Sequence, residues 1–192
     1  LVDTYCYNNY SSLAMKNFTP VTYAGYEEGL IPENASTYMI YQEGIYVGYK
    51  YYETRYEDYV MGTGNAGEYA YGDDVAFAFG HGLSYTDFEY SDVSVSYDAA
   101  AGTYTMNVTV TNTGDLPGKE TVQAYVSSPY TQYDIDNKVE KASVSLVGFA
   151  KTEILEPGTS ETLAIEIDGD YVVSYDAYGA KTYILAVSYT HL

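Results

Sequence analysis

Carboxylates are the main side chains of this 192-residue sequence that could carry out catalysis, since Asp and Glu together number 27. Four of them, Glu43, Glu53, Glu57 and Asp58, fall within one tyrosine-rich stretch. Hydrolysis of a glycosidic bond requires two carboxyl groups that face one sugar, roughly 5–10 Å apart depending on the mechanism. Sequence spacing does not establish that geometry, so we interpret these four carboxylates as structural or solvated groups.

Histidine is the next candidate for chemistry. His81 lies between Gly80 and Gly82 and could carry a proton near neutral pH. We favour a packed residue that donates to a backbone carbonyl. The sequence contains no Cys/His cluster with metal spacing, no phosphate-binding glycine loop, no Gly-x-Ser-x-Gly elbow and no EF-hand pattern. We therefore predict no catalytic residue, no cofactor-binding residue and no metal ligand in this chain.

The charge of the chain limits its partners. Eight basic residues against 27 acidic ones give a formal net charge of −19. Nucleic acids and anionic membrane surfaces repel a field of this sign, so we expect neither as a partner.

No apolar run approaches the roughly 18 residues of a membrane-spanning helix. Cys6 is the only cysteine, which rules out an internal disulfide and slightly favours a cytoplasmic, bacterial protein, with secretion left open.

Two regions of the sequence differ in pattern. Residues 1–82 mix tyrosine, glycine and charges, and Tyr49–Val60 has tyrosines at spacings of three and four that predict a short helix. From Phe88 onward the pattern alternates with a period of two. Strands are predicted within residues 88–97, 103–114, 118–129, 142–158, 159–168 and 181–187. Short strands with no amphipathic helix between them predict a mainly β fold, an immunoglobulin/fibronectin III-like β-sandwich of about 100 residues.

The core of this sandwich must come from the alternating apolar positions, because the sequence has no tryptophan and no pair of cysteines. On an alternating strand every second side chain faces the opposite sheet. We expect the inward-facing residues to be Val108, Val110, Val122, Ala124, Val126, Leu163, Ile165 and Ile167.

Four longer strings occur in order along the chain: YQEGIYVGYKYYETR (41–55), FAFGHGLSYTDFEYSDVSV (77–95), VTVTNTGDLPGKETVQAYVSSP (108–129) and LVGFAKTEILEPGTSETLAIEI (146–167). The first two resemble the carboxyl-terminal part of glycoside hydrolase family 3, the β-glucosidase and β-xylosidase type. Lys50 stands where that family usually has Arg, and Ala78 where it usually has Pro. The last two resemble the fibronectin type III-like domain that follows in those enzymes.

The resemblance implies a partial enzyme. In that family the nucleophile is an Asp in a TIM-like barrel, and the acid/base of the β-glucosidase branch is a Glu upstream of the first string. Residues 1–82 are then the carboxyl-terminal remnant of the α/β sandwich domain, and residues 83–192 the fibronectin-like sandwich. The implied partners are the barrel and the rest of the α/β domain, and the substrate is a β-glycoside of the whole retaining enzyme. This chain alone is expected to be inactive.

The tyrosine-rich stretch allows several interpretations. Charge excludes a membrane-surface patch, while aromatic faces could stack on pyranose rings. We favour tyrosines that pack the last elements of the α/β domain against their neighbours, with hydroxyls on polar partners. For the chain as a whole, the alternative is a stand-alone carbohydrate-binding or adhesion module, because a β-sandwich by itself does not decide function.

The end of the sequence departs from the resemblance. Residues 187–192 read VSYTHL, which one frame of a common transposon-end sequencing adapter encodes. We therefore expect 187–192 to be an adapter-derived artefact. His191 would then have no functional meaning.

Overall fold

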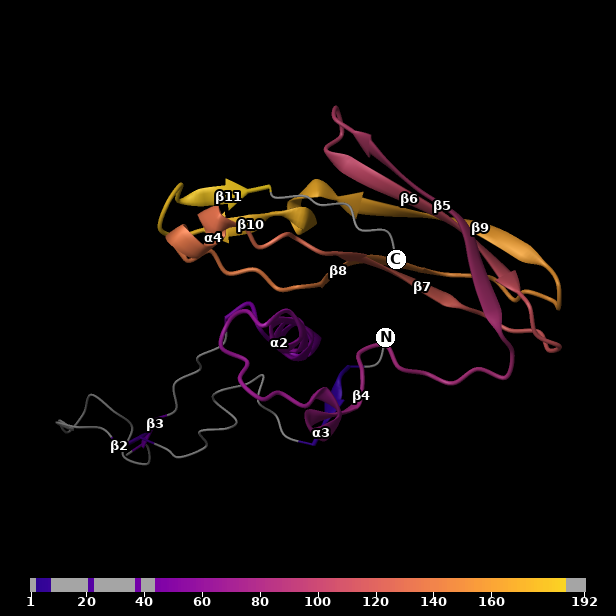
Figure 1. The fold of residues 1–192 in the computed structure, drawn as a ribbon. Helices are drawn as coiled ribbons and strands as arrows, with labels where there is room; N and C mark the ends of the chain where they lie inside the picture. The colour runs from indigo at the N-terminus through magenta and orange to yellow at the C-terminus, as the bar shows by residue number, and fades with distance from the viewer. Residues whose placement is uncertain (1–2, 8–20, 23–36, 39–43, 186–192) are drawn as a thin grey trace. The chain divides into compact units, whose positions relative to one another are not determined.

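The computed structural model describes residues 3–7, 21–22, 37–38 and 44–185. The chain divides into two compact units, Leu1–His81 and Gly82–Leu192 (Figure 1). Among the described residues, none of the helices combines the length and the apolar character that a membrane crossing requires.

The first unit contains short strand pairs and helices. Strand β1 (Tyr5–Cys6) pairs antiparallel with β4 (Val75–Phe77), and β2 (Val21–Thr22) pairs antiparallel with β3 (Thr37–Tyr38). Helix α3 (Tyr71–Asp74) is a single turn that leads directly into β4. The assignment of residues 1–82 to the end of an α/β domain stays a prediction.

Helix α2 (Tyr49–Met61) is the main element of the first unit and confirms the helix predicted at this position. It ends because Gly62 adopts the left-handed conformation, with φ at 67°, and donates its N–H to the carbonyls of Asp58 and Tyr59. Of its tyrosines, Tyr52 is almost completely buried, at 1% exposure.

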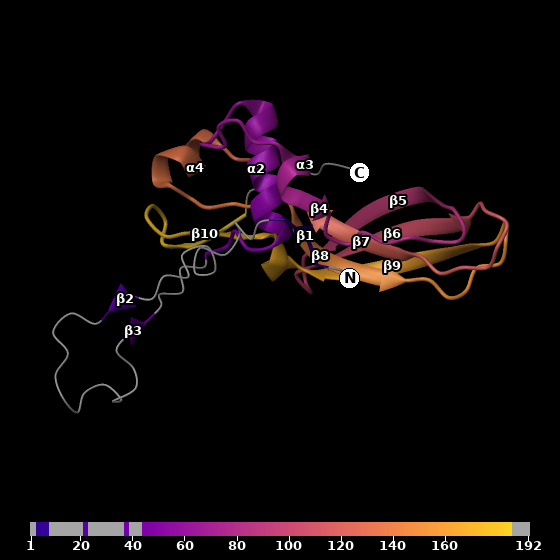
Figure 2. The same cartoon turned by 90° about the horizontal axis from the view of Figure 1, so that it is seen from below.

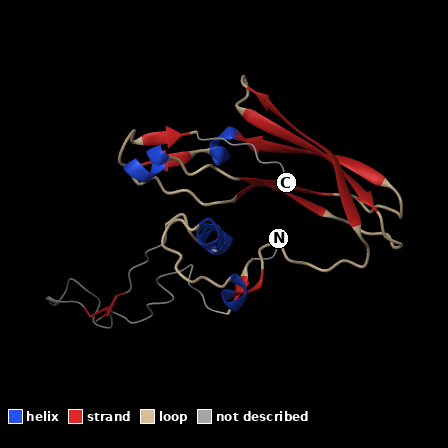
Figure 3. Cartoon of the chain, viewed as in Figure 1, coloured by secondary structure: helices blue, strands red, loops and turns tan. Residues whose placement is uncertain are grey.

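The second unit is a two-layer β-sandwich, as predicted (Figures 1 and 3). One sheet has the order β5-β6-β9, with β5 at Phe88–Asp98, β6 at Thr103–Asn112 and β9 at Ser160–Asp168, and both pairings are antiparallel. The second sheet pairs β7 (Thr121–Val126) with β8 (Ser145–Lys151). Figure 2 shows the long strands of this unit side by side.

Two connections of the second unit carry further elements. Helix α4 (Gln132–Asn137) lies between β7 and β8, where the sequence pattern indicated no helix. The 3-10 helix η1 (Gly169–Val172) follows β9 and leads into a hairpin of β10 (Ser174–Asp176) and β11 (Thr182–Ile184).

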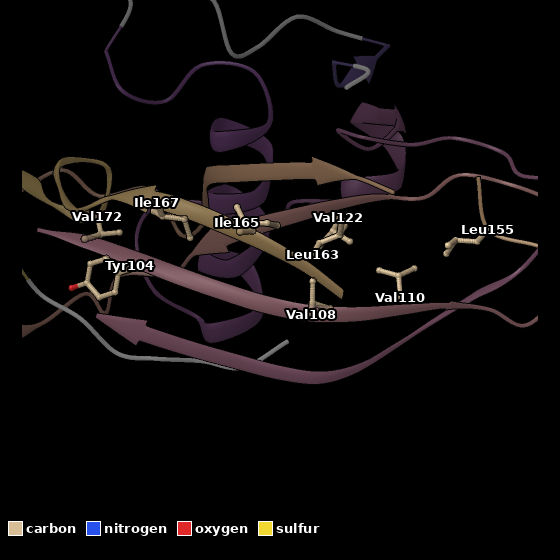
Figure 4. Close-up of a cluster of buried hydrophobic side chains, with 10 residues drawn as sticks. Tyr104, Val108, Val110, Val122, Leu155, Leu163, Ile165, Ile167 and Val172 are labelled. Carbon is tan, nitrogen blue, oxygen red and sulfur yellow. The ribbon is translucent and has the colours of Figure 1, made fainter. Parts of the chain in front are cut away.

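The core of the sandwich comes mainly from the predicted positions (Figure 4). All of the predicted core residues except Val126 are buried. Val126 is half-buried and packs against the core, because the pairing of β7 with β8 becomes irregular between Ala124 and Tyr125. The sequence analysis missed Tyr104, Leu155 and Val172, which complete the buried cluster.

Candidate functional site

Two carboxylates of helix α2, Glu53 and Asp58, form hydrogen bonds within the first unit. Glu53 accepts a hydrogen bond of 2.5 Å from the hydroxyl of Tyr71. Burial raises the pKa of this tyrosine, and its hydrogen bond to Glu53 raises it further. Glu57 is exposed, and Glu43 lies outside the described residues. Glu53 therefore holds α3 against α2.

Asp58 organises the loop that follows α2. Its Oδ1 accepts a hydrogen bond of 3.1 Å from the Thr63 hydroxyl, and its carbonyl accepts the Thr63 N–H at 2.9 Å. A Cβ atom at Gly64 would lie 2.5 Å from the Asp58 carboxylate, and Gly64 has φ at +60°. This glycine-rich turn thus wraps closely around one acidic side chain.

The guanidinium group of Arg55 on α2 contacts two tyrosine rings. The Arg55 guanidinium carbon lies 5.9 Å from the ring centre of Tyr51 and 5.7 Å from that of Tyr69, and Arg55 donates to the Ala66 carbonyl at 3.1 Å. Burial raises the pKa of Tyr69, whose hydroxyl has no hydrogen-bond partner among the described residues. Both rings pack on Arg55, and the ring of Tyr51 also lies 5.2 Å from that of Tyr52.

His81 is an exposed residue at the end of the first unit. Its backbone N–H donates to the carbonyl of Ala78 at 3.1 Å, and its ring lies 4.8 Å from the ring of Phe77. His191 lies outside the described residues, as do all of residues 187–192.

In the part of the chain that the structure describes, no group of three or more His, Cys, Asp or Glu side chains could hold a metal ion.

The second unit contains a buried polar centre at the end of β6 that the sequence analysis did not single out. Asn112 is fully buried, and its amide donates to the carbonyls of Leu116 and Leu155, both at 2.8 Å. Its side-chain oxygen accepts from the Thr86 hydroxyl at 2.7 Å and from the Gly114 N–H at 3.1 Å. One side chain thus uses its full hydrogen-bonding capacity to tie three loops together.

The glycines near Asn112 are required by close packing. A Cβ at Gly114 would overlap the hydroxyl of Thr86 and lie 2.7 Å from the backbone nitrogen of Asp87. A Cβ at Gly118 would lie 2.6 Å from the methyl of Thr86 and 3.1 Å from the ring of Phe88. The spacing N-T-G-x-x-x-G, one of the strings that carry the family resemblance, therefore has a packing explanation.

A buried ion pair fixes the connection that contains α4. Lys141 Nζ lies 2.8 Å from Asp134 Oδ1, and the two side chains are only 2% and 1% exposed. Burial alone would raise the pKa of Asp134, but hydrogen bonds from Lys141 and Thr131 outweigh it and hold that pKa below its usual value. Thr131 and Asp134 also form a capping box at the start of α4, a sequence signal that could have predicted this helix.

A second buried carboxylate organises the β10–β11 hairpin. Asp176 is fully buried and accepts backbone N–H groups from Tyr178, Gly179 and Ala180 at 3.1, 2.7 and 2.7 Å. It also accepts the Tyr133 hydroxyl at 2.6 Å. The hydrogen bond from Ala180, then that from Tyr133, lowers the pKa of Asp176 to about 2. This carboxylate is a stable anion that closes a tight turn.

Comparison with known proteins shows what the chain is similar to. Residues 120–190 match the family model described as a fibronectin type III-like domain. The chain is 36% identical over 155 residues to β-glucosidase A of Butyrivibrio fibrisolvens, which covers 74% of this chain and 16% of that relative. The crystal structure of a β-glucosidase from Paenibacillus barengoltzii superposes with a TM-score of 0.63 at 31% identity, covering 94% of this chain and 16% of that one.

The chain contains a fibronectin type III-like domain and is similar to β-glucosidases of glycoside hydrolase family 3, as a carboxyl-terminal fragment of such an enzyme would be. It spans about a sixth of the length of the β-glucosidases that it matches. A further relative is an exo-α-(1→6)-L-arabinopyranosidase of Bifidobacterium breve, 38% identical over 128 residues, which cover 67% of this chain and 14% of that protein. Similar segments thus occur in glycosidases named for different sugars.

Glycines in the last two strings that carry the family resemblance lie at packing positions of the described structure. Gly148 of the LVGFAK string illustrates this, because a Cβ there would lie 2.7 Å from Ile165 of the facing sheet. Asn112, Gly114 and Gly118 play the equivalent part at the end of β6. What the family signature specifies in this region is the fit of the sandwich.

Proposed function

We propose that this chain is the non-catalytic carboxyl-terminal part of a retaining β-glycosidase that hydrolyses terminal β-linked sugars. The observation that carries this proposal is that the chain spans only 16% of the β-glucosidase relative that it matches over 74% of its own length. Residues 1–82 would be the end of the α/β domain, and residues 83–192 the sandwich that supports the catalytic domains.

The chemistry of the whole enzyme would use two carboxyl groups about 5–5.5 Å apart. One attacks the anomeric carbon and forms a covalent glycosyl-enzyme, while the other protonates the leaving oxygen and then activates water. Neither group is expected in this chain. In support, Glu53 and Asp58 are hydrogen-bonded within the first unit, where their bonds hold α3 and the Thr63 turn.

The catalytic part of the proposal is tested with the isolated chain and 4-nitrophenyl β-D-glucoside. We expect no release of nitrophenol above buffer, with the Paenibacillus barengoltzii β-glucosidase as the positive control. Hydrolysis that disappears in a Glu53→Gln variant would contradict the proposal, since it would place a reactive carboxylate in this chain.

The supporting role is tested in a chimera. Residues 44–185 replace the matching segment of the Paenibacillus barengoltzii enzyme, to which the chain is 31% identical. We expect a soluble chimera that hydrolyses the glucoside, and an insoluble or inactive protein when the segment is deleted. A deletion that leaves solubility and activity intact would argue against a supporting role.

A second candidate function is a stand-alone carbohydrate-binding module. The observation in its favour is a set of exposed tyrosines around the β10–β11 hairpin, where the rings of Tyr175 and Tyr183 lie 5.2 Å apart and are 52% and 69% exposed. Affinity electrophoresis on soluble β-glucans separates the two candidates. Retardation that is lost in a Tyr175→Ala, Tyr183→Ala variant would favour the binding module.

A further inference from the structure

Two tyrosine side chains meet on the β10–β11 hairpin of the second unit (Figure 1). Tyr175 of β10 lies directly opposite Tyr183 of β11 in the antiparallel pairing, and their ring centres are 5.2 Å apart with an angle of 66° between the ring planes. This is the edge-to-face arrangement that contacting aromatic rings favour. We call these two residues the hairpin tyrosine pair.

Both rings of the hairpin tyrosine pair are accessible from solvent, since Tyr175 is 52% and Tyr183 is 69% exposed. The contact between Tyr97 and Tyr104 is closer, with ring centres 4.5 Å apart, but Tyr104 is buried at 7% exposure. A reagent in solution therefore reaches both members of the hairpin tyrosine pair, whereas it reaches only one member of the Tyr97–Tyr104 contact.

The buried carboxylate of Asp176 keeps the hairpin tyrosine pair in register. Asp176 follows Tyr175 directly, so its side chain points to the opposite face of the strand. There it accepts three backbone N–H groups of the turn and the hydroxyl of Tyr133. These bonds close the turn between β10 and β11, so the two rings face each other without any rearrangement of the hairpin.

Two phenol rings in contact can be joined by one-electron oxidation. Each tyrosine loses one electron and its hydroxyl proton and becomes a tyrosyl radical. The two radicals couple through the ring carbons next to their oxygens, and the hydrogen atoms on those carbons move to the oxygens and restore both hydroxyls. The product is dityrosine, and the two electrons and two protons released convert one molecule of hydrogen peroxide into two of water.

The arrangement favours a link within one chain over a link between chains. Two reacting groups that are held in contact behave as if each were present at a very high local concentration. Coupling between copies is further slowed by repulsion, because each copy has a formal net charge of −19.

We propose that Tyr175 and Tyr183 form an oxidative modification site, at which a haem peroxidase with hydrogen peroxide links the two rings as dityrosine within one chain. The link closes the β10–β11 hairpin covalently. The inference rests on the contact and the exposure of the two rings, and it is independent of the supporting role proposed above.

Peptide mapping of the oxidised full chain tests the link. Trypsin cleaves after Lys151 and Lys181, so Tyr175 and Tyr183 lie on the separate peptides 152–181 and 182–192. After treatment with a haem peroxidase and hydrogen peroxide, we expect one joined species with the summed mass of the two peptides less two hydrogen atoms. The protein should show dityrosine fluorescence and still migrate as a monomer, and tandem mass spectra should place the link at Tyr175 and Tyr183.

Tyr183→Phe localises the reaction, because it keeps the ring and removes the phenol hydroxyl. The yield of the joined species should fall at least about tenfold, with the Tm of the unoxidised protein unchanged. Tyr178→Phe is the matched control, since Tyr178 is also 69% exposed and shares a tryptic peptide with Tyr175. Its yield should equal that of the wild type.

Three results would overturn the proposal. The first is an undiminished yield of the joined species in Tyr183→Phe, and the second is a link that the spectra place at other tyrosines. The third is dityrosine that occurs only in covalent dimers.

Hydrogen exchange tests whether the link closes the hairpin. In the cross-linked chain the amides of β10 and β11 should exchange at least about tenfold more slowly than in the unoxidised chain, because the link restricts local opening. Unchanged exchange at these amides would contradict covalent closure of the hairpin.

Discussion

Single buried polar residues hold the connections of the sandwich in place. Asn112, Asp134 and Asp176 are each at most 1% exposed. Asn112 and Asp176 join segments distant in sequence, and Asp134 ties α4 to the nearby Lys141. Buried polar groups are costly unless their hydrogen bonds are complete, so these three positions should be far more sensitive than their exposed neighbours.

Asn112→Ala tests the first of these centres. The substitution leaves the carbonyls of Leu116 and Leu155 and the hydroxyl of Thr86 buried without their partner. We expect the free energy of unfolding to fall by about 3 kcal/mol in urea titrations. Thr113→Ala, at an exposed neighbouring position, should change it by less than about 0.5 kcal/mol. Equal effects of the two substitutions would disprove the role of Asn112.

Lys141→Met tests the buried ion pair. The change leaves the Asp134 carboxylate charged and unpaired, so we expect a loss of about 3–5 kcal/mol in unfolding free energy. The double variant Asp134→Leu, Lys141→Met removes both charges and should recover about 2 kcal/mol or more. A double variant as unstable as the sum of the two single variants would show that the charges do not interact.

The pH dependence of stability tests Asp176. Its pKa is about 2 in the folded protein, against about 3.9 for an unperturbed Asp. Because the folded-state pKa is lowered, the stabilisation is fully present above about pH 4 and is lost as the pH falls towards 2. Urea titrations between pH 2 and 5 should show a shallower pH dependence in Asp176→Asn than in the wild type. Asp115→Asn, at an exposed position, should retain the wild-type slope.

At the scale of elements, alternation predicted the sandwich because the strand period and the burial period coincide. β6 and β9 follow the prediction closely, since alternate residues of each are buried. The strand predicted within residues 181–187 contains β11, whereas α4 and β10 were not predicted. The capping box of Thr131 and Asp134 is a local signal for α4 that was overlooked, but the partners Lys141 and Tyr133 that stabilise these elements are not visible in a local pattern. The buried polar centres were missed for the same reason.

The two sheets of the sandwich approach each other closely at Gly148, which has no side chain. A Cβ at Gly148 of β8 would lie 2.7 Å from Ile165 of β9, so Gly148→Ala should lower the unfolding free energy by about 1–3 kcal/mol. Gly82→Ala is the matched control, because nothing lies within 4 Å of its Cβ position. The cost of Gly148→Ala should shrink in an Ile165→Ala background, as measured by a double-mutant cycle. An undiminished cost there would assign the effect to the backbone of β8.

At the scale of the whole molecule, the chain is two units joined by an exposed segment. Leu83 and Tyr85 are 97% and 93% exposed, whereas Thr86 is buried by its hydrogen bond to Asn112. Residues 81–85 are all exposed, and burial begins abruptly at Thr86. An exposed segment without regular structure can enter a protease site with little local unfolding.

Limited proteolysis with chymotrypsin should therefore cut, among the described residues, first after Leu83 or Tyr85. Edman sequencing of the larger product should then begin at Ser84 or Thr86, and the product should retain the cooperative unfolding of the sandwich, because the hydrogen bonds of Asn112 lie beyond the cut. A Leu83→Ser, Tyr85→Ser variant removes both cleavage sites and serves as the control, since neither side chain is buried. First cuts within β6 or β9 would mean that the sandwich opens more easily than the segment that precedes it, which would contradict the division into two units.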